Sequence, residues 1–469
     1  MKNQELPDYI VAAQAVPISK RAAWFSTIAP AYIGVLLKFV FWQDIPTGGG
    51  ALGGTLSHGL GWAFLALVTA ALLCHFLFYW VPASLGMSTG LPLYVVATST
   101  YGVRGGLLIP GFLMGVLQFG WVGVNAYFSA LLLVAPFGYA PLSMPHRVVC
   151  AVWIAAGAIV GLKGIRYVAR LGTFLPIIIL VILLVLTGKT IGGLRSFDPQ
   201  ALQNAASAAG SSTTDVLSIA GIFTVLLTYM TGFFPTAGAA GADLARNCRN
   251  SRDVQLGGLV GVAGSMIVGG GLALVITAGA HGLGLGDPNV MNPTKLMPTI
   301  MGVKIAAVFH YLLALTCFPG LCFGCLVAAT CVKTTLPKVH PVISVSIGSL
   351  GAVLLCVTGL VGDVMLAFTA IGASFAPICG AMAADYLLAG RRWAGPRSGF
   401  NLAGWISWAV GFAVGVSDIL ATNIPALHNM KGTVPVPPLA AFIVGFVLYL
   451  ILAKIGLQSR LLTYDRAAT

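Results

Sequence analysis

The sequence predicts an all-α integral membrane protein with about twelve transmembrane helices. Hydrophobic residues make up 58% of the 469 residues and charged residues only 8%, so the chain cannot build the charged surface that a water-soluble protein needs. Apolar runs of about 20 residues, the length that crosses a bilayer as a helix, recur along the chain. The 59 glycines fit this class, because small residues let membrane helices pack closely together.

Polar, glycine and proline clusters separate the apolar runs and set the limits of the predicted spans. The spans cover residues 22–55, 60–82, 105–135, 147–163, 169–190, 215–242, 257–280, 302–332, 340–358, 362–389, 401–421 and 436–456. We therefore expect one transmembrane domain at 22–456, between tails at 1–21 and 457–469. Residues 1–20 lack the uninterrupted apolar core of a cleavable signal peptide, so the N-terminal tail is expected to stay in the cytoplasm.

The distribution of basic residues predicts the orientation of these spans. With the N-terminus inside, most lysines and arginines fall in cytoplasmic segments, as the positive-inside rule requires. The outer segments hold only Arg147, Lys189, Arg195, Lys295, Lys304 and Lys431. A missed or invented span would exchange the later loops and dilute this bias. The charges therefore predict a multi-pass protein of the cell membrane with both termini in the cytoplasm.

Helix-breaking residues interrupt the first and the sixth predicted spans. In the first, Pro46 removes a backbone donor and three glycines follow, so we expect the helix to break within Gln43–Gly50. In the sixth, Pro235 and spaced glycines lie within Gly232–Gly241. Unpaired backbone groups at membrane depth are tolerated only where they are buried in protein or line a cavity.

Breaks at corresponding positions of two halves are typical of inverted-repeat transporters, which bind their substrate near the middle of the membrane. We place five-helix repeats at 22–190 and 215–389, followed by two further helices at 401–456. The alternative interpretation is that both prolines kink their helices without a role in binding.

Composition also excludes several classes of function. The net charge of +13 does not indicate nucleic-acid binding, because the basic residues lie between apolar runs and not on one face. Most of the nine cysteines lie within apolar stretches, with no histidine at metal-ligand spacing around them, so we expect neither a metal site nor a cofactor. No paired acid and base side chains share one depth, which argues against an enzyme.

Short motifs spread over most of the chain form a recognisable set. They are Thr47-Gly48-Gly49, the stretch from Gln118 to Val124, the stretch from Phe234 to Asp243 with Arg246 and Arg249-Asn250 after it, Ala376-Pro377, and Ala384 to Leu387. In this order and spacing they resemble the nucleobase:cation symporter family, especially its bacterial cytosine permease branch. The resemblance implies a permease that imports a nucleobase such as cytosine, or a related heterocycle, together with a cation by alternating access.

The resemblance also implies a substrate site. Trp121 and Phe234 fall where the family stacks the substrate ring between two aromatic faces, and Gln118 falls where it places an amide against the base edge. Base stacking on an aromatic side chain contributes about 1–3 kcal/mol, and an amide offers both a donor and an acceptor. Gln118 and Trp121 share a helix face. Without the resemblance, Trp121 could equally serve lipid or core packing.

Three further residues complete the predicted site. Phe233 stands where a relative has a small polar residue, so the site is expected to be tighter or more apolar. Asn125 continues the helix face of Gln118 and either reaches the cavity or bonds to a neighbouring helix. Thr316 is the polar position from the eighth span, where the cytosine-type pattern has an amide, which weakens the case for cytosine itself.

The resemblance fails at the coupling-ion position. Sodium-coupled relatives have a pair of hydroxyl residues in the eighth span, but this chain has Pro319-Gly320, which supply no side-chain oxygen. A proton is therefore expected in preference to sodium. Lys38 and Asp44 are the candidates for ion coupling, because charges at membrane depth are costly without a function. Alternatively, Lys38 extends to the interface and Asp44 caps the second half-helix.

Two other functions remain open. Stacked aromatic rings also attract cations, so an amino-acid or amine carrier with the same inverted-repeat fold would suit these residues. A non-transporting sensor is the other alternative, although the predicted tails are too short to carry a soluble signalling domain.

Overall fold

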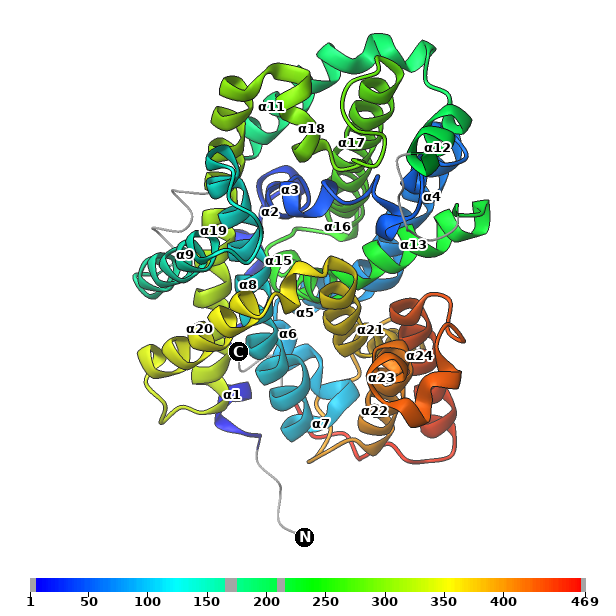
Figure 1. The fold of residues 1–469 in the computed structure, drawn as a ribbon. Coiled ribbons are helices and arrows are strands. Elements are labelled where there is room, and N and C mark those ends of the chain that lie inside the picture. The colour runs from blue at the N-terminus through cyan, green and yellow to red at the C-terminus, as the bar shows by residue number, and fades with distance from the viewer. Residues whose placement is uncertain (1–5, 165–174, 209–215, 465–469) are drawn as a thin grey trace.

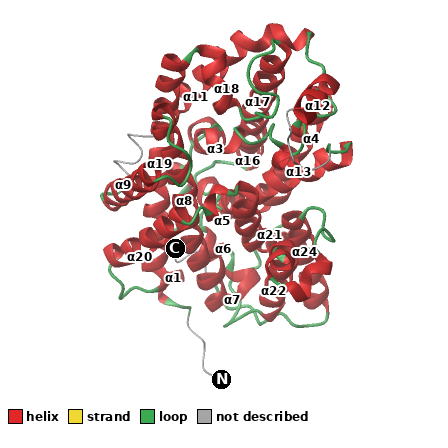
Figure 2. Ribbon diagram, viewed as in Figure 1, coloured by secondary structure: helices red, strands yellow, loops and turns green. Residues whose placement is uncertain are grey.

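The described part of the chain is helical throughout. The computed structural model describes residues 6–164, 175–208 and 216–464, and within these ranges it contains no β-strand (Figure 2). Some residues of the predicted spans, among them Arg170 and residue 215, lie outside the described ranges. The predicted all-α class is confirmed.

The α-helices follow one another along the chain with short connections. They are α1 (Asp8–Val11), α2 (Ile28–Leu36), α3 (Phe39–Trp42), α4 (Leu60–Leu73), α5 (Trp80–Thr89), α6 (Leu93–Val96), α7 (Thr98–Gly106), α8 (Leu113–Val134), α9 (Met144–Leu162), α11 (Leu175–Thr190), α12 (Pro199–Ala208), α13 (Ile219–Phe233), α14 (Pro235–Ala239), α15 (Gly241–Ala245), α16 (Ser251–Gly258), α17 (Ser265–Gly282), α18 (Pro293–Met301), α19 (Val303–Thr335), α20 (Pro341–Val357), α21 (Val364–Leu388), α22 (Leu402–Gly415), α23 (Ser417–Asn423) and α24 (Pro437–Lys454).

Several of these helices join into units long enough to span a membrane. Eight units in the described ranges qualify by length and composition, or up to ten if each of two bent pairs counts as one span. The shorter apolar helix α20 matches the predicted span 340–358. Apolar side chains such as Phe76 and Leu350 are exposed on the outside of the bundle, as lipid contact requires. The count of twelve stays a prediction.

The first helix is broken, but earlier than predicted. α2 ends at Leu36, Lys38 adopts an extended backbone (φ −61°, ψ 142°), and α3 begins at Phe39. The stretch Gln43–Gly50, where we expected the break, instead forms turns beyond the end of α3. Pro46 and the glycines therefore end the helix and do not interrupt it.

Contacts from other positions stabilise this early break. The Trp42 indole N–H donates to the Leu37 carbonyl at 2.9 Å. The Tyr229 hydroxyl lies 3.1 Å from the Val40 carbonyl and 2.8 Å from the Phe41 carbonyl. These side chains pair backbone oxygens that would otherwise be unsatisfied inside the bundle. The Trp42 contact is local, whereas the Tyr229 contact comes from α13 and cannot be deduced from the sequence around the break.

The break in the sixth helix lies where the sequence predicts it. α13 ends at Phe233, α14 begins at Pro235, and the two parts are bent by 48°. Proline suits the first position of the new helix, because its missing N–H would have no intrahelical partner there.

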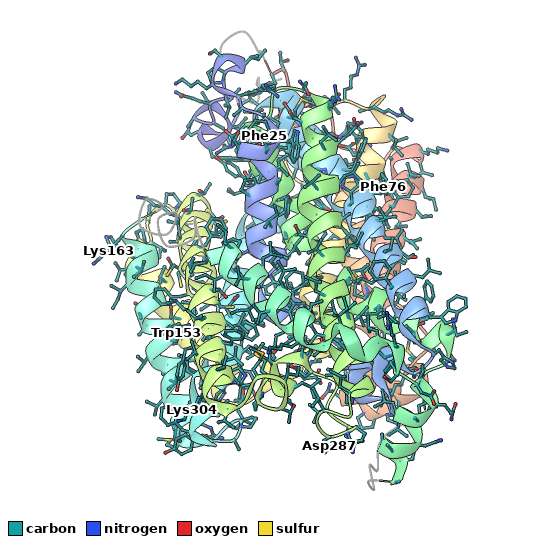
Figure 3. All side chains as sticks on the ribbon, turned by 90° about the horizontal axis from the view of Figure 1, so that it is seen from above. Phe25, Phe76, Trp153, Lys163, Asp287 and Lys304 are labelled. Carbon is teal, nitrogen blue, oxygen red and sulfur yellow. The ribbon has the colours of Figure 1, made fainter. Side chains whose placement is uncertain are left out.

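The long helices form two groups around the broken ones. α8 packs against α9, α19 and α20, and α4 packs against α13 and α17, while α2 and α3 lie between these groups (Figure 1). α21 contacts α13 and carries the C-terminal helices α22 and α24 on its other side. Phe25 lies near one end of the helices and Asp287 and Lys304 near the other (Figure 3). Because α2 and α3 lie between the two groups and α13 contacts both α4 and α21, both breaks lie inside the bundle.

Candidate functional site

Five aromatic side chains from different helices meet beside the two breaks. This aromatic cluster consists of Phe41 (α3), Trp121 (α8), Tyr229 and Phe233 (α13) and Phe368 (α21). The ring of Phe233 lies at its centre, with centroids 4.9 Å from Trp121, 5.0 Å from Phe41 and 5.0 Å from Phe368. The rings meet edge to face or tilted, which is the arrangement that aromatic quadrupoles favour.

Trp121 is anchored to the second half of the broken sixth helix. Its indole N–H donates to the Thr236 hydroxyl at 3.1 Å, and Thr236 belongs to α14. Trp121 is only half-buried, unlike most of the rings around it. Trp121 is therefore the member of the aromatic cluster whose ring surface is accessible to a ligand.

The sequence predicts Phe234 opposite Trp121, but the ring that contacts Trp121 is that of Phe233. Phe234 is fully buried and its ring lies 5.9 Å from that of Tyr32, away from Trp121. Neighbouring residues of a helix point about 100° apart, so only one of the two rings can face α8. Which rings contact a substrate stays a prediction.

The two amides predicted on α8 differ in their surroundings. Gln118 is half-buried, and its amide nitrogen lies 3.5 Å from the Met114 sulfur, which is a weak acceptor. Asn125 is buried and donates to the Trp121 carbonyl at 2.7 Å, within its own helix. Gln118 is thus the amide with more freedom to bind a ligand.

Thr316 on α19 is buried, and its hydroxyl donates to the Leu313 carbonyl at 2.6 Å. A hydroxyl bonded to its own helix has an acceptor oxygen left but no free donor.

Asp44 lines a cavity of about 430 Å³ that adjoins the aromatic cluster. One carboxylate oxygen accepts from the Asn292 amide at 3.0 Å, and the other is buried without a hydrogen-bond partner in the described ranges. Thr47, Tyr229 and Asp363 line the same cavity. Asp44 follows α3 and caps no second half-helix, unlike the alternative we considered.

Lys38 extends from the first break to α19. A Cβ atom built on Gly320 would lie 1.9 Å from the Lys38 Nζ atom, so the ammonium group occupies the space beside this glycine. The two ion pairs of the described ranges, Arg249–Asp253 and Arg397–Asp385, involve neither Lys38 nor Asp44.

Sequence reasoning missed Thr236, Asn292 and Phe368. Thr236 directly follows the Phe234-Pro235 motif, so its position beside the break was a usable signal. Phe368 reaches the cluster because α13 and α21 touch through glycines: a Cβ on Gly372 would lie 2.5 Å from the Gly232 Cα. Such closeness between distant segments cannot be deduced from one sequence.

Comparison with known proteins places the chain in a family. A family model described as permease for cytosine/purines, uracil, thiamine, allantoin matches residues 16–436. The chain belongs to this family, the nucleobase:cation symporters. Membership makes it a membrane permease and not an enzyme.

Related proteins agree with this assignment. Cytosine permease of Escherichia coli (strain K12) is 28% identical over 414 residues, which cover 86% of each chain, and cytosine permease of Escherichia coli O157:H7 is 27% identical. Among solved structures, inward-facing Mhp1 has a TM-score of 0.68 at 17% identity, covering 98% of this chain and 97% of its own. Closed Mhp1, a nucleobase-cation-symport-1 family transporter with bromovinylhydantoin bound, has a TM-score of 0.67 at 15% identity, covering 97% and 98%. These structures share the permease's fold.

Proposed function

We propose that this permease imports a nucleobase, or a planar heterocycle of similar size, and that Trp121, Phe233 and Gln118 form the core of its binding site. The observation that carries the proposal is the half-buried Trp121 ring, held against Phe233 and anchored by Thr236 at the sixth-helix break. A flat π-system can stack on such a ring, and the Gln118 amide one turn away can pair with its polar edge. The similarity to bacterial cytosine permeases supports this substrate class.

Uptake measurements test the substrate class. Cells that express the protein are given radiolabelled cytosine, uracil, adenine, hypoxanthine, allantoin and several amino acids. We expect uptake of at least one heterocycle, and its loss in Trp121→Ala. Trp153→Ala is the matched control, because Trp153 packs edge-on against Phe318 outside the aromatic cluster. Uptake of amino acids alone would contradict the proposal and favour the amine-carrier alternative.

We further propose that the co-transported cation is a proton and that Asp44 carries it. Support comes from the unpartnered carboxylate oxygen of Asp44 at the cavity and from Pro319-Gly320 in α19, which supply no side-chain oxygen for sodium. The titratable groups around Asp44 are Tyr229 of α13, Lys295 of α18 and Asp363 before α21.

Ion replacement tests the coupling. We expect wild-type uptake to be unchanged when choline replaces sodium and to rise as the outside pH falls. Sodium-dependent uptake that ignores pH would contradict proton coupling.

The membrane arrangement is part of the proposal. We infer a plasma-membrane protein with both termini in the cytoplasm and inverted repeats at 22–190 and 215–389. Phe25 and Lys304 lie at opposite ends of the helices, as this topology requires (Figure 3). Single cysteines beside Arg147, Lys295 and Lys431 should react with impermeant reagents from outside, whereas those beside Arg252 and Lys338 should not. Outside labelling at 252 would overturn the topology.

A further inference from the structure

Lys38 occupies an unusual position for a basic residue. It directly follows the C-terminal end of α2, between the two halves of the broken first helix. The last carbonyl groups of α2 carry partial negative charge and favour a cation, whereas the short helix α3, of which Lys38 is the N-cap, presents its N-terminal end to the same residue. In Figure 1, α2 and α3 lie between the other helices, so the segment that joins them is surrounded by protein helices and not by lipid tails.

The Lys38 side chain extends sideways to α19 and not towards an interface. Its Nζ atom lies against Gly320, and the Asn125 amide oxygen of α8 lies 3.7 Å from the position that a Cβ on Gly320 would take. The buried Cys317 thiol of α19 and the buried Ser129 hydroxyl of α8 lie next to each other in the same surroundings. The ammonium group thus joins the first break to α8 and α19.

Within the described ranges, no carboxylate neutralises this ammonium group. In the part of the chain that the structure describes, no carboxylate lies within ion-pair distance of Lys38, because the two ion pairs found there involve other residues. A half-buried cation inside the bundle is costly without a counter-ion, so its position is expected to serve a function. The adjacent segment of α19, Pro319-Gly320, supplies no side-chain oxygen that could coordinate a metal ion.

We propose that the Lys38 ammonium group is a built-in cation that connects the end of α2 to α19, occupies the space a bound metal cation would need, and makes the transport cycle independent of sodium. Lys38 is a positioning residue in this proposal, because it acts on the helix break and not on the substrate. Gly320 is the position that leaves room for the ammonium. This inference rests on the proposed function only in the experiments that measure uptake, and not in the measurement of thermal stability without substrate.

Two substitutions at Lys38 test the charge. Lys38→Met keeps an unbranched side chain, one heavy atom shorter, but removes its charge, and we expect uptake to fall by about tenfold or more. Because alanine keeps the Cβ atom, Lys38→Ala leaves a narrow, unbranched space of the size of a propylammonium group. We expect added methylammonium to restore its uptake and tetramethylammonium, which is too large for the space, to have no effect. Lys304→Ala, which removes an exposed lysine, is the control and should transport like the wild type.

A substitution at Gly320 tests the same contact from the other side. In Gly320→Ala the new methyl group would meet the end of the Lys38 side chain at 1.9 Å, and the next residue, Asn125, only at 3.7 Å. The ammonium must therefore move while the backbone has room to stay, and uptake should fall as in Lys38→Met. Gly188→Ala, at a helical glycine with open space around it, is the matched control.

A measurement without substrate separates this inference from the proposed function. Methylammonium should raise the thermal stability of purified Lys38→Ala and leave that of the wild type unchanged. If the wild type takes up no heterocycle but this stabilisation is found, the substrate proposal fails and the built-in cation stands. Wild-type uptake in Lys38→Met or in Gly320→Ala, or a folded Lys38→Ala that ignores methylammonium, would overturn the built-in cation.

Discussion

Both broken helices interrupt their backbone inside the bundle, but the two breaks carry different kinds of side chain. The first break has a charged residue, Lys38, and no proline at the break, whereas the sixth has Pro235 preceded by the aromatic pair Phe233 and Phe234. Tyr229 of the sixth helix donates to the carbonyls of Val40 and Phe41 just beyond the first break, so the two regions are directly bonded. A break that proline creates is defined locally, and a break without proline needs partners from elsewhere.

The two breaks therefore place different groups inside the bundle. The first break presents a cation to α19, and the sixth presents a ring to Trp121. If the comparison is correct, substitutions at the sixth break should alter substrate binding or packing, and substitutions at the first should alter the dependence on ions. The following predictions test that separation.

The largest effect is expected from Phe234→Ala. The ring is fully buried against Tyr32, so its removal should destabilise the protein by about 3–5 kcal/mol through the cavity it leaves. Thermal unfolding in detergent measures this loss, with Phe76→Ala at an exposed position as the control. Normal stability together with a complete loss of ligand binding would mean that Phe234, and not Phe233, faces the substrate.

Trp121→Ala should weaken substrate binding by the free energy of one stacked ring, about 1–3 kcal/mol. The loss should appear as a smaller ligand-induced thermal shift, because the binding energy that stabilises the folded state is reduced. Unfolding without ligand should change less than in Phe234→Ala, since Trp121 is only half-buried. An unchanged thermal shift would remove Trp121 from the site.

Asp44→Asn should abolish the rise of uptake at acidic outside pH and leave ligand binding close to that of the wild type. Asparagine keeps an oxygen that can accept from the Asn292 amide, so the local structure should persist while the titrating group is lost. Uptake measured across outside pH shows the difference. A retained pH profile would assign the proton to another group.

The smallest effect is expected from Tyr229→Phe. It removes a hydroxyl that bonds to two backbone carbonyls at the first break and should cost about 1 kcal/mol of stability. Its ring remains in the aromatic cluster, so substrate stacking should survive. A loss of binding larger than that of Trp121→Ala would show that the two breaks cannot be treated as separate tasks.

The sequence by itself determined the membrane class, the approximate spans and the break in the sixth helix. Long apolar runs require lipid as the solvent, and Pro235 together with its neighbouring glycines disfavours a continuous helix, although α19 and α21 continue through Pro319 and Pro377. These features follow from the covalent chemistry of neighbouring residues, so they are visible in one chain. Gln118 and Trp121 could be selected because their motif resembles a family, and Phe233 because it differs from a relative at the position before the Phe234 motif.

Only the tertiary structure decided where the first helix breaks, which phenylalanine faces Trp121 and where the Lys38 ammonium lies. Each depends on a partner far along the chain: Tyr229 for the break, Phe368 for the aromatic cluster and Gly320 for the ammonium. Phe233 and Phe234 are chemically identical neighbours, and the direction each ring takes is fixed by the bend of the backbone between α13 and α14. Contacts of this kind arise from the packing of whole helices, and the order of residues along one helix carries no record of them.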